Sequence, residues 1–252
     1  MVAFIRAWAR VHWALLFGGV LVGWALLFAM AIPQELRVLE GTYGAALVAA
    51  LCGPTPGTAG PLAAITMWAL MSAAMMAPTA LPAFAAYDDL GHATEVRMGP
   101  LVAGYLVVWL GFSVFAGSAQ VALFEVGLIG RFGHSQSAAV SGALLIGAGL
   151  YQFTALKEAC LSRCRAPLTF FMQHFDEGPW RNGLRLGMDC LGCCWALMLL
   201  AFVGGTMNLA FMGLAMVIMT LEKLPEIGRP VTKPLGGALI AAGAVTWALA
   251  LA

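Results

Sequence analysis

Five of the six cysteines in this chain fall within residues 160–194. Three of them lie close together in the run Asp189-Cys190-Leu191-Gly192-Cys193-Cys194-Trp195. Cys190 and Cys193 form a C-x-x-C pair, and we expect Gly192 to let the chain turn so that both thiols face one ion. Thiols are soft ligands, which bind Cu(I), zinc and iron–sulfur clusters in preference to hard cations. The run therefore predicts a soft-metal site.

A second thiol pair, Cys160 and Cys164, precedes this run on the other side of a polar segment. Its i, i+4 spacing puts both sulfurs on one face of a helix. Two cysteine pairs separated by a loop are typical of soft-metal and structural zinc sites. Arg163 and Arg165 flank Cys164, and neighbouring cations favour the thiolate that binds metal. We expect the two pairs to hold one ion, copper or alternatively zinc, with Cys194 as a spare thiol; the competing interpretation is a set of buried, inert cysteines.

Methionine sulfurs could extend this site. The chain has 14 methionines, and Met67, Met71 and Met75 recur every four residues in one apolar run. Met198 lies one helical turn beyond the cysteine run, and further methionines recur within 207–221. Thioethers favour Cu(I) over zinc, although methionine stripes at helical spacing are also common in packed cores. We include Met71, Met75 and Met198 in the predicted copper site.

The composition excludes an ordinary soluble domain. Of the 252 residues, 62% are hydrophobic and 10% are charged, whereas soluble domains are about 45–50% apolar and about 25% charged. The net charge of +1 provides no basic surface for nucleic acid. No polar stretch reaches the roughly 50 residues of the smallest domains. We therefore expect one integral membrane domain over 1–252, surrounded by a lipid bilayer.

Apolar runs of about 20 residues, the length that crosses the hydrocarbon layer, predict an all-α bundle with about seven transmembrane helices. The apolar stretch at 41–52 is shorter and is followed by a turn-rich break, so we expect an interfacial or re-entrant helix there. The first long run exceeds the apolar part of a cleaved signal peptide, and we expect it to be retained. The expected spans are 11–32, 61–86, 100–124, 137–156, 184–202, 207–221 and 235–252.

Basic residues orient the predicted bundle, because cytoplasmic loops carry an excess of Lys and Arg. With a cytoplasmic N-terminus and seven spans, all of the 13 basic residues except Arg37 and Arg131 fall on the inner side. The C-terminus is then on the outer side, and the clustered cysteines lie near the cytoplasmic face, where thiols stay reduced. We expect Lys223 and Glu158, which stand at span ends, to extend to water or to pair helices.

Several segments resemble a bacterial family of predicted metal-binding integral membrane proteins, long described as a domain of unknown function. The resemblance implies metal handling, with copper-chaperone-like roles for some members, and makes the expected location a bacterial inner membrane with a periplasmic C-terminus. The segments are Trp68-x-x-Met71-x-x-Ala74-Met75-Met76-x-Pro78, Gly149-x-Tyr151-Gln152-x-x-x-x-Lys157-x-x-Cys160-x-x-x-Cys164-Arg165-x-Pro167, Gly187-x-x-Cys190-x-Gly192-Cys193-Cys194-Trp195-x-Leu197-Met198, Met207-Asn208 and Glu222-Lys223.

These features predict a membrane protein that binds Cu(I) and hands it to a cuproenzyme or a soluble chaperone. No hydrolase, NTPase or dinucleotide motif is present, so we expect no catalytic activity. A metal or small-solute transporter is an alternative, although no intramembrane carboxylate pathway or inverted repeat is visible. A thiol–disulfide protein would instead cycle Cys190 and Cys193. In a zinc-stapled structural subunit, the cysteines would hold zinc without any turnover.

Overall fold

The computed structural model describes residues 2–31, 59–90, 96–130, 133–206 and 208–251. These residues form an all-α bundle, as predicted, and no β-strand occurs among them. Cys52 and the expected interfacial helix at 41–52 lie outside the described residues. In chain order the elements are α1 (Val2–Ala31), α3 (Ala59–Thr79), α4 (Leu81–Leu90), α5 (Met98–Glu125), α6 (Ala138–Tyr151), α7 (Ala155–Arg165), α8 (Pro167–His174), the 3-10 turn η2 (Phe175–Glu177), α9 (Pro179–Leu199), α10 (Ala201–Gly204), α11 (Leu209–Lys223) and α12 (Gly228–Leu251).

Five of the described helices are long and apolar enough to cross a membrane, or six if one bent pair counts as a span. The bent pair is α6 and α7, which meet at 63°; α6 lies within the expected span at 137–156, and α7 begins at its end and continues to Arg165. The bend follows from Thr154, whose hydroxyl accepts a hydrogen bond from the backbone N–H of Lys157 and so begins a new helix. The expected span at 207–221 is α11, which has only 15 residues against the ~20 that cross the hydrocarbon core.

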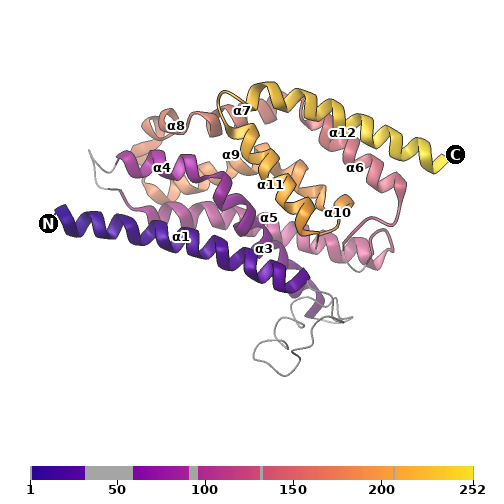
Figure 1. Cartoon of the computed structure of the whole chain (residues 1–252), viewed down its shortest axis with the longest axis horizontal. Coiled ribbons are helices and arrows are strands. Elements are labelled where there is room, and N and C mark those ends of the chain that lie inside the picture. Colours follow the sequence, from indigo (N-terminus) through magenta and orange to yellow (C-terminus); the bar gives the residue numbers. More distant parts are fainter. Residues whose placement is uncertain (1, 32–58, 91–95, 131–132, 207, 252) are drawn as a thin grey trace.

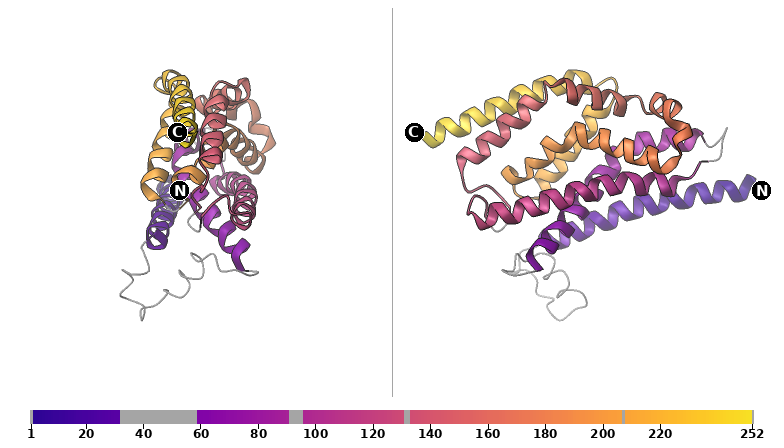
Figure 2. Two further views of the ribbon diagram at one scale, coloured as in Figure 1. Left: turned by 90° about the vertical axis from the view of Figure 1, so that its right-hand side faces the viewer. Right: turned by 180° about the vertical axis from the view of Figure 1, so that it is seen from behind.

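The chain runs back and forth along the long axis of the molecule, so that α1 begins and α12 ends at opposite ends (Figures 1 and 2). Close contacts between helices agree with this path. Leu101 of α5 lies against Gly183 of α9, and Val108 lies against Gly187, so α5 and α9 run parallel. A chain whose two termini lie at opposite ends of the molecule must pass along its long axis an odd number of times. α11 provides the short return pass between α9 and α12.

Large aromatic side chains fill the centre of the bundle, while apolar side chains, both aliphatic and aromatic, cover its outside. Trp68 and Tyr105 are fully buried, and the Trp68 indole donates a hydrogen bond of 2.7 Å to Gln120 Oε1. Leu15 in α1 and Leu249 in α12 are 70% and 75% exposed. Aqueous solvent would not favour such a surface, but lipid would, because its chains are as apolar as leucine.

Buried charges connect α7 to α11 and α12. Lys157 Nζ lies 2.9 Å from Glu222 Oε2, and each side chain is only 1% exposed. Arg165 donates to the Glu222 backbone carbonyl at 2.9 Å and to Thr232 Oγ1 at 3.2 Å. Glu158, by contrast, is largely exposed and pairs with Arg165 from the surface. Lys157 and Arg165 are therefore structural parts of the interior as well as contributors to the charge pattern.

Candidate metal centre

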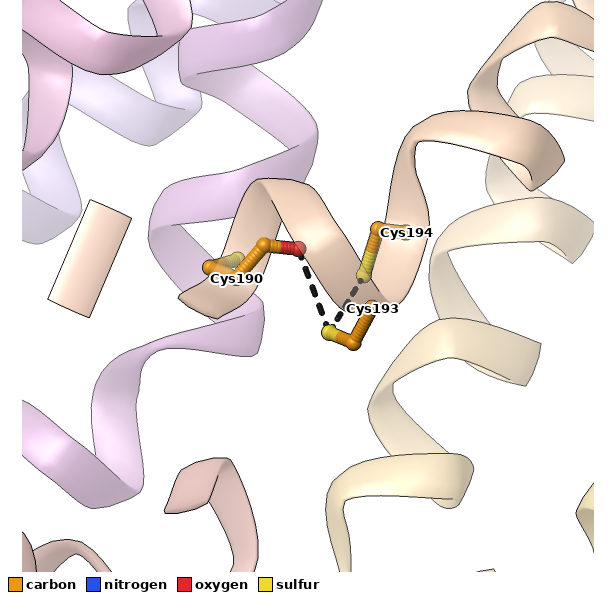
Figure 3. A group of neighbouring side chains, drawn as sticks. All are labelled: Cys190, Cys193 and Cys194. Atoms are coloured by element: carbon orange, nitrogen blue, oxygen red, sulfur yellow. Dashed lines mark hydrogen bonds between the residues drawn. The ribbon is translucent and has the colours of Figure 1, made fainter. Parts of the chain in front are cut away.

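Three thiols of α9 form a compact buried group. The sulfurs of Cys190, Cys193 and Cys194 all lie within 4.8 Å of one another, and each residue is 1% exposed. Figure 3 shows that Cys193 Sγ points back toward its neighbours, 3.1 Å from the Cys190 carbonyl oxygen and 3.2 Å from Cys194 Sγ. The i, i+3, i+4 spacing puts all three on one helix face. Metal–thiolate bonds of about 2.3 Å allow sulfurs around one ion to be up to about 4.6 Å apart, so the group fits a metal ion with little movement.

Gly192 has a different role from the one its position suggested. We expected it to turn the chain, but α9 continues through it without interruption, so that expectation is wrong. The physical reason lies on α7, where Cys160 packs against this position: a Cβ on Gly192 would be 2.5 Å from Cys160 Sγ. Glycine therefore allows α7 to approach α9 closely, and the helix itself brings the thiols together.

The second thiol pair lies beside this group without joining it. Cys160 is buried against Gly192, and Cys164 is half-buried and lies near Cys193. The two cysteine segments are thus neighbours. The predicted ligands were Cys160, Cys164, Cys190 and Cys193, whereas the closely spaced group consists of Cys190, Cys193 and Cys194. The nearby Arg163 is directed to Asp189, at 2.8 Å, and not to a thiol. Which thiols are ligands stays a prediction.

Cys190 has two polar partners from other helices. Lys223 Nζ of α11 donates to Cys190 Sγ at 3.0 Å and to Thr79 Oγ1 at 2.6 Å. The Tyr105 hydroxyl of α5 lies 3.1 Å from the same sulfur and donates to the Met76 carbonyl oxygen at 2.9 Å. Of the two roles expected for Lys223, the structure shows the pairing of helices and not extension to water, because its ammonium group joins α11 to α3 and α9 inside the bundle.

Lys223 supplies the positive charge of this interior site. Its ammonium group is buried and lies 3.0 Å from Cys190 Sγ. A buried thiolate without a counter-charge is costly, and an adjacent ammonium group compensates it. One weak signal in the sequence indicated this role, a lysine at a span end. No such signal marked Tyr105, which stands in an ordinary apolar run.

Thioethers from three helices meet a short distance from the thiols. The three methionines predicted for the site come together around one small cavity, where they are joined by a fourth that the prediction did not include. Met67, which belongs to the same sequence stripe, is buried elsewhere. The four methionines of the cavity are Met71 and Met75 of α3, Met198 of α9 and Met212 of α11.

The donors gathered here are all soft sulfurs, which suit Cu(I) better than hard cations. No curated protein and no solved structure matches the chain. A family described as a copper chaperone, PpoB2, matches residues 65–246, from α3 into α12, and this range contains all five thiols and four thioethers described above. The resemblance to a copper-chaperone-like family is thereby confirmed: the chain belongs to the copper chaperone family PpoB2.

Proposed function

We propose that this protein holds Cu(I) as its cargo inside a membrane, bound by the thiols of Cys190, Cys193 and Cys194, and delivers it to a cuproenzyme or a soluble chaperone. The observation that supports this most directly is the group of three buried thiols within 4.8 Å. Structural zinc sites almost always have four ligands, and this group has three, all of them soft sulfurs that Cu(I) prefers.

The surrounding residues support thiolate ligation. A thiol must lose its proton to become a strong ligand, so metal binding releases protons. Lys223, 3.0 Å from Cys190 Sγ, stabilises the negative charge that remains on sulfur. Tyr105 fixes the orientation of that sulfur from the opposite helix. Burial of the thiols excludes water, so that hydrated competitors such as magnesium, which dehydrate reluctantly, are disfavoured.

The proposed setting is a bacterial inner membrane, with the N-terminus in the cytoplasm and the C-terminus in the periplasm. It is supported by the uneven distribution of basic residues and by the opposite positions of the start of α1 and the end of α12. That the thiols lie near the cytoplasmic face stays a prediction; in this orientation α11 ends on that side, at Lys223, which contacts Cys190. The three thiols are buried, so an ion bound by them is shielded from water.

The proposal is tested by the metal content of protein purified in detergent without chelators. We expect about one copper per chain in the wild type and almost none in Cys190→Ser/Cys193→Ser. Cys160→Ser/Cys164→Ser is the matched control, because these thiols lie on α7 outside the close group, and it should retain its copper. Zinc in place of copper would favour the structural subunit. Metal-free protein with thiols that oxidise and reduce in pairs would favour the thiol–disulfide protein.

Delivery is tested in cells that lack the protein, by the activity of copper-dependent oxidases in their membranes. We expect reduced activity that is restored by the wild-type gene or by added copper, but not by the Cys190→Ser/Cys193→Ser gene. Unchanged oxidase activity in the deletion strain at limiting copper would contradict delivery while leaving copper binding intact.

A further inference from the structure

A small cavity lies between α3, α9 and α11, and half of the residues that line it are methionines. The four methionine side chains are all 1–2% exposed, so they belong to the interior and not to the lipid-facing surface. The remaining wall is apolar, formed by Leu197, Ala201, Phe211 and Ala215. The thioether sulfurs are therefore the side-chain donor atoms that this wall offers to a ligand.

Simple packing does not account well for this arrangement. Methionine has a flexible, unbranched side chain that normally fills irregular gaps in a core. Here four such side chains, from three different helices, converge on one cavity of about 10 Å³. The cavity is too small for a hydrated ion, but rotation of the flexible side chains could bring their sulfurs to a bare Cu(I) ion.

We propose that Met71, Met75, Met198 and Met212 form a second Cu(I) site, which holds the ion on its way to or from the thiols. Thioethers are soft and uncharged, so they suit Cu(I) and not zinc. With no anionic group in the wall, a bound ion keeps its full positive charge in an apolar setting, which is costly. The site therefore binds more weakly than thiolates do, as a transfer station requires.

The position of the cavity connects it to the thiols. Met198 follows Cys194 by four residues, so both lie on the same face of α9, about 6 Å apart along its axis. Met75 adjoins Met76, whose carbonyl oxygen accepts the hydrogen bonds of Tyr105 and Thr79 beside Cys190. Cu(I) moves between the sites by ligand exchange, without a change of oxidation state, and each thiol that binds as a thiolate releases its proton.

Copper K-edge X-ray absorption of selenomethionine-substituted protein tests the site, because selenium neighbours of copper can only be methionines. Cysteine ligands are removed by Cys190→Ser/Cys193→Ser/Cys194→Ser, and the protein is loaded with Cu(I) alone. We expect selenium in the first shell of copper. It should disappear when Met71→Leu, Met75→Leu, Met198→Leu and Met212→Leu are added, exchanges that conserve volume. It should persist in the matched control Met67→Leu/Met219→Leu, which alters buried methionines outside the cavity.

The protein with intact thiols tests whether copper passes through the methionine site before it reaches the thiols. This sequence of binding rests on the proposed function. The four Met→Leu exchanges should leave about one copper per chain at equilibrium but slow its loading from a Cu(I)–chelator complex by at least tenfold. Absence of selenium neighbours in the thiol-free protein, with its fold retained in thermal unfolding, would overturn the methionine site. Selenium neighbours without any copper at the thiols of the intact chain would instead overturn the proposed function and leave the methionine site standing.

Discussion

Among the three clustered thiols, Cys190 has the most polar surroundings. Its sulfur contacts both the Lys223 ammonium group and the Tyr105 hydroxyl, whereas Cys193 and Cys194 contact each other. The cation makes Cys190 the thiol at which negative charge is least costly. Within the proposed copper site, Cys190 is therefore the anchoring ligand, and its two neighbours complete the coordination from one turn further along α9.

Replacement of Lys223 by methionine tests this role. The exchange keeps an unbranched side chain but removes the ammonium group, so that a thiolate at Cys190 loses its counter-charge. Partners of metal ligands typically contribute about 10–100-fold to affinity, and we expect Cu(I) affinity to fall by roughly that factor in competition with a chromogenic chelator. Lys233→Met is the control, because Lys233 is exposed. Equal affinity in both variants would remove Lys223 from the site.

At the scale of elements, the ion pair between Lys157 and Glu222 fixes α7 against α11. Breaking a buried pair is costly because one charge is left without a partner, whereas replacing both members with apolar groups is often neutral or stabilising. We expect Glu222→Gln to destabilise the protein by about 3–5 kcal/mol and to lower the midpoint of thermal unfolding in detergent. Lys157→Met/Glu222→Leu should recover most of the loss. A double variant no more stable than Glu222→Gln would show that the charges themselves are needed.

Individual helices could be predicted from the sequence better than their mutual contacts. Runs of about 20 apolar residues locate spans because the bilayer imposes that length, and α1, α5 and α9 follow from it. The break between α6 and α7 depends on a side-chain cap at Thr154, which hydropathy does not reveal. The i, i+4 spacing of Cys160 and Cys164 correctly placed both on one helix, but spacing within a helix does not identify the neighbour that its face will meet.

The same limit applies to the roles of the site residues. Cys194, expected as a spare thiol, is part of the close thiol group because α9 stays helical, whereas the C-x-x-C pattern suggested a turn. Lys223 reaches Cys190 only because the end of α11 packs against the middle of α9. Met212 meets Met198 across the same pair of helices. These contacts join residues far apart in the chain, and such pairing is set by the packing of the whole bundle.

At the scale of the whole molecule, the alternating helix directions predict that the two ends lie on opposite sides of the membrane, and the basic residues predict which side is cytoplasmic. If α11 completes a pass, seven passes separate the termini, and a C-terminal alkaline phosphatase fusion should be active in the periplasm. A fusion after Leu224, one pass earlier, should be inactive, because α11 would end on the cytoplasmic side. Activity of the Leu224 fusion together with inactivity of the C-terminal fusion would invert the orientation. Inactivity of both would indicate that α12 does not cross.

The pairing of Lys223 with Cys190 has a consequence for the energetics of copper uptake. A cation and one thiolate together are electrically neutral. The site stays neutral if one further thiol exchanges its proton for Cu(I) while the third sulfur binds as a neutral thiol, because one positive charge replaces another. A single uncompensated charge that crosses a potential of 100 mV gains or loses about 2.3 kcal/mol. When the proton leaves by the side from which the ion enters, no net charge is displaced, so the voltage across an energised membrane does no work on loading.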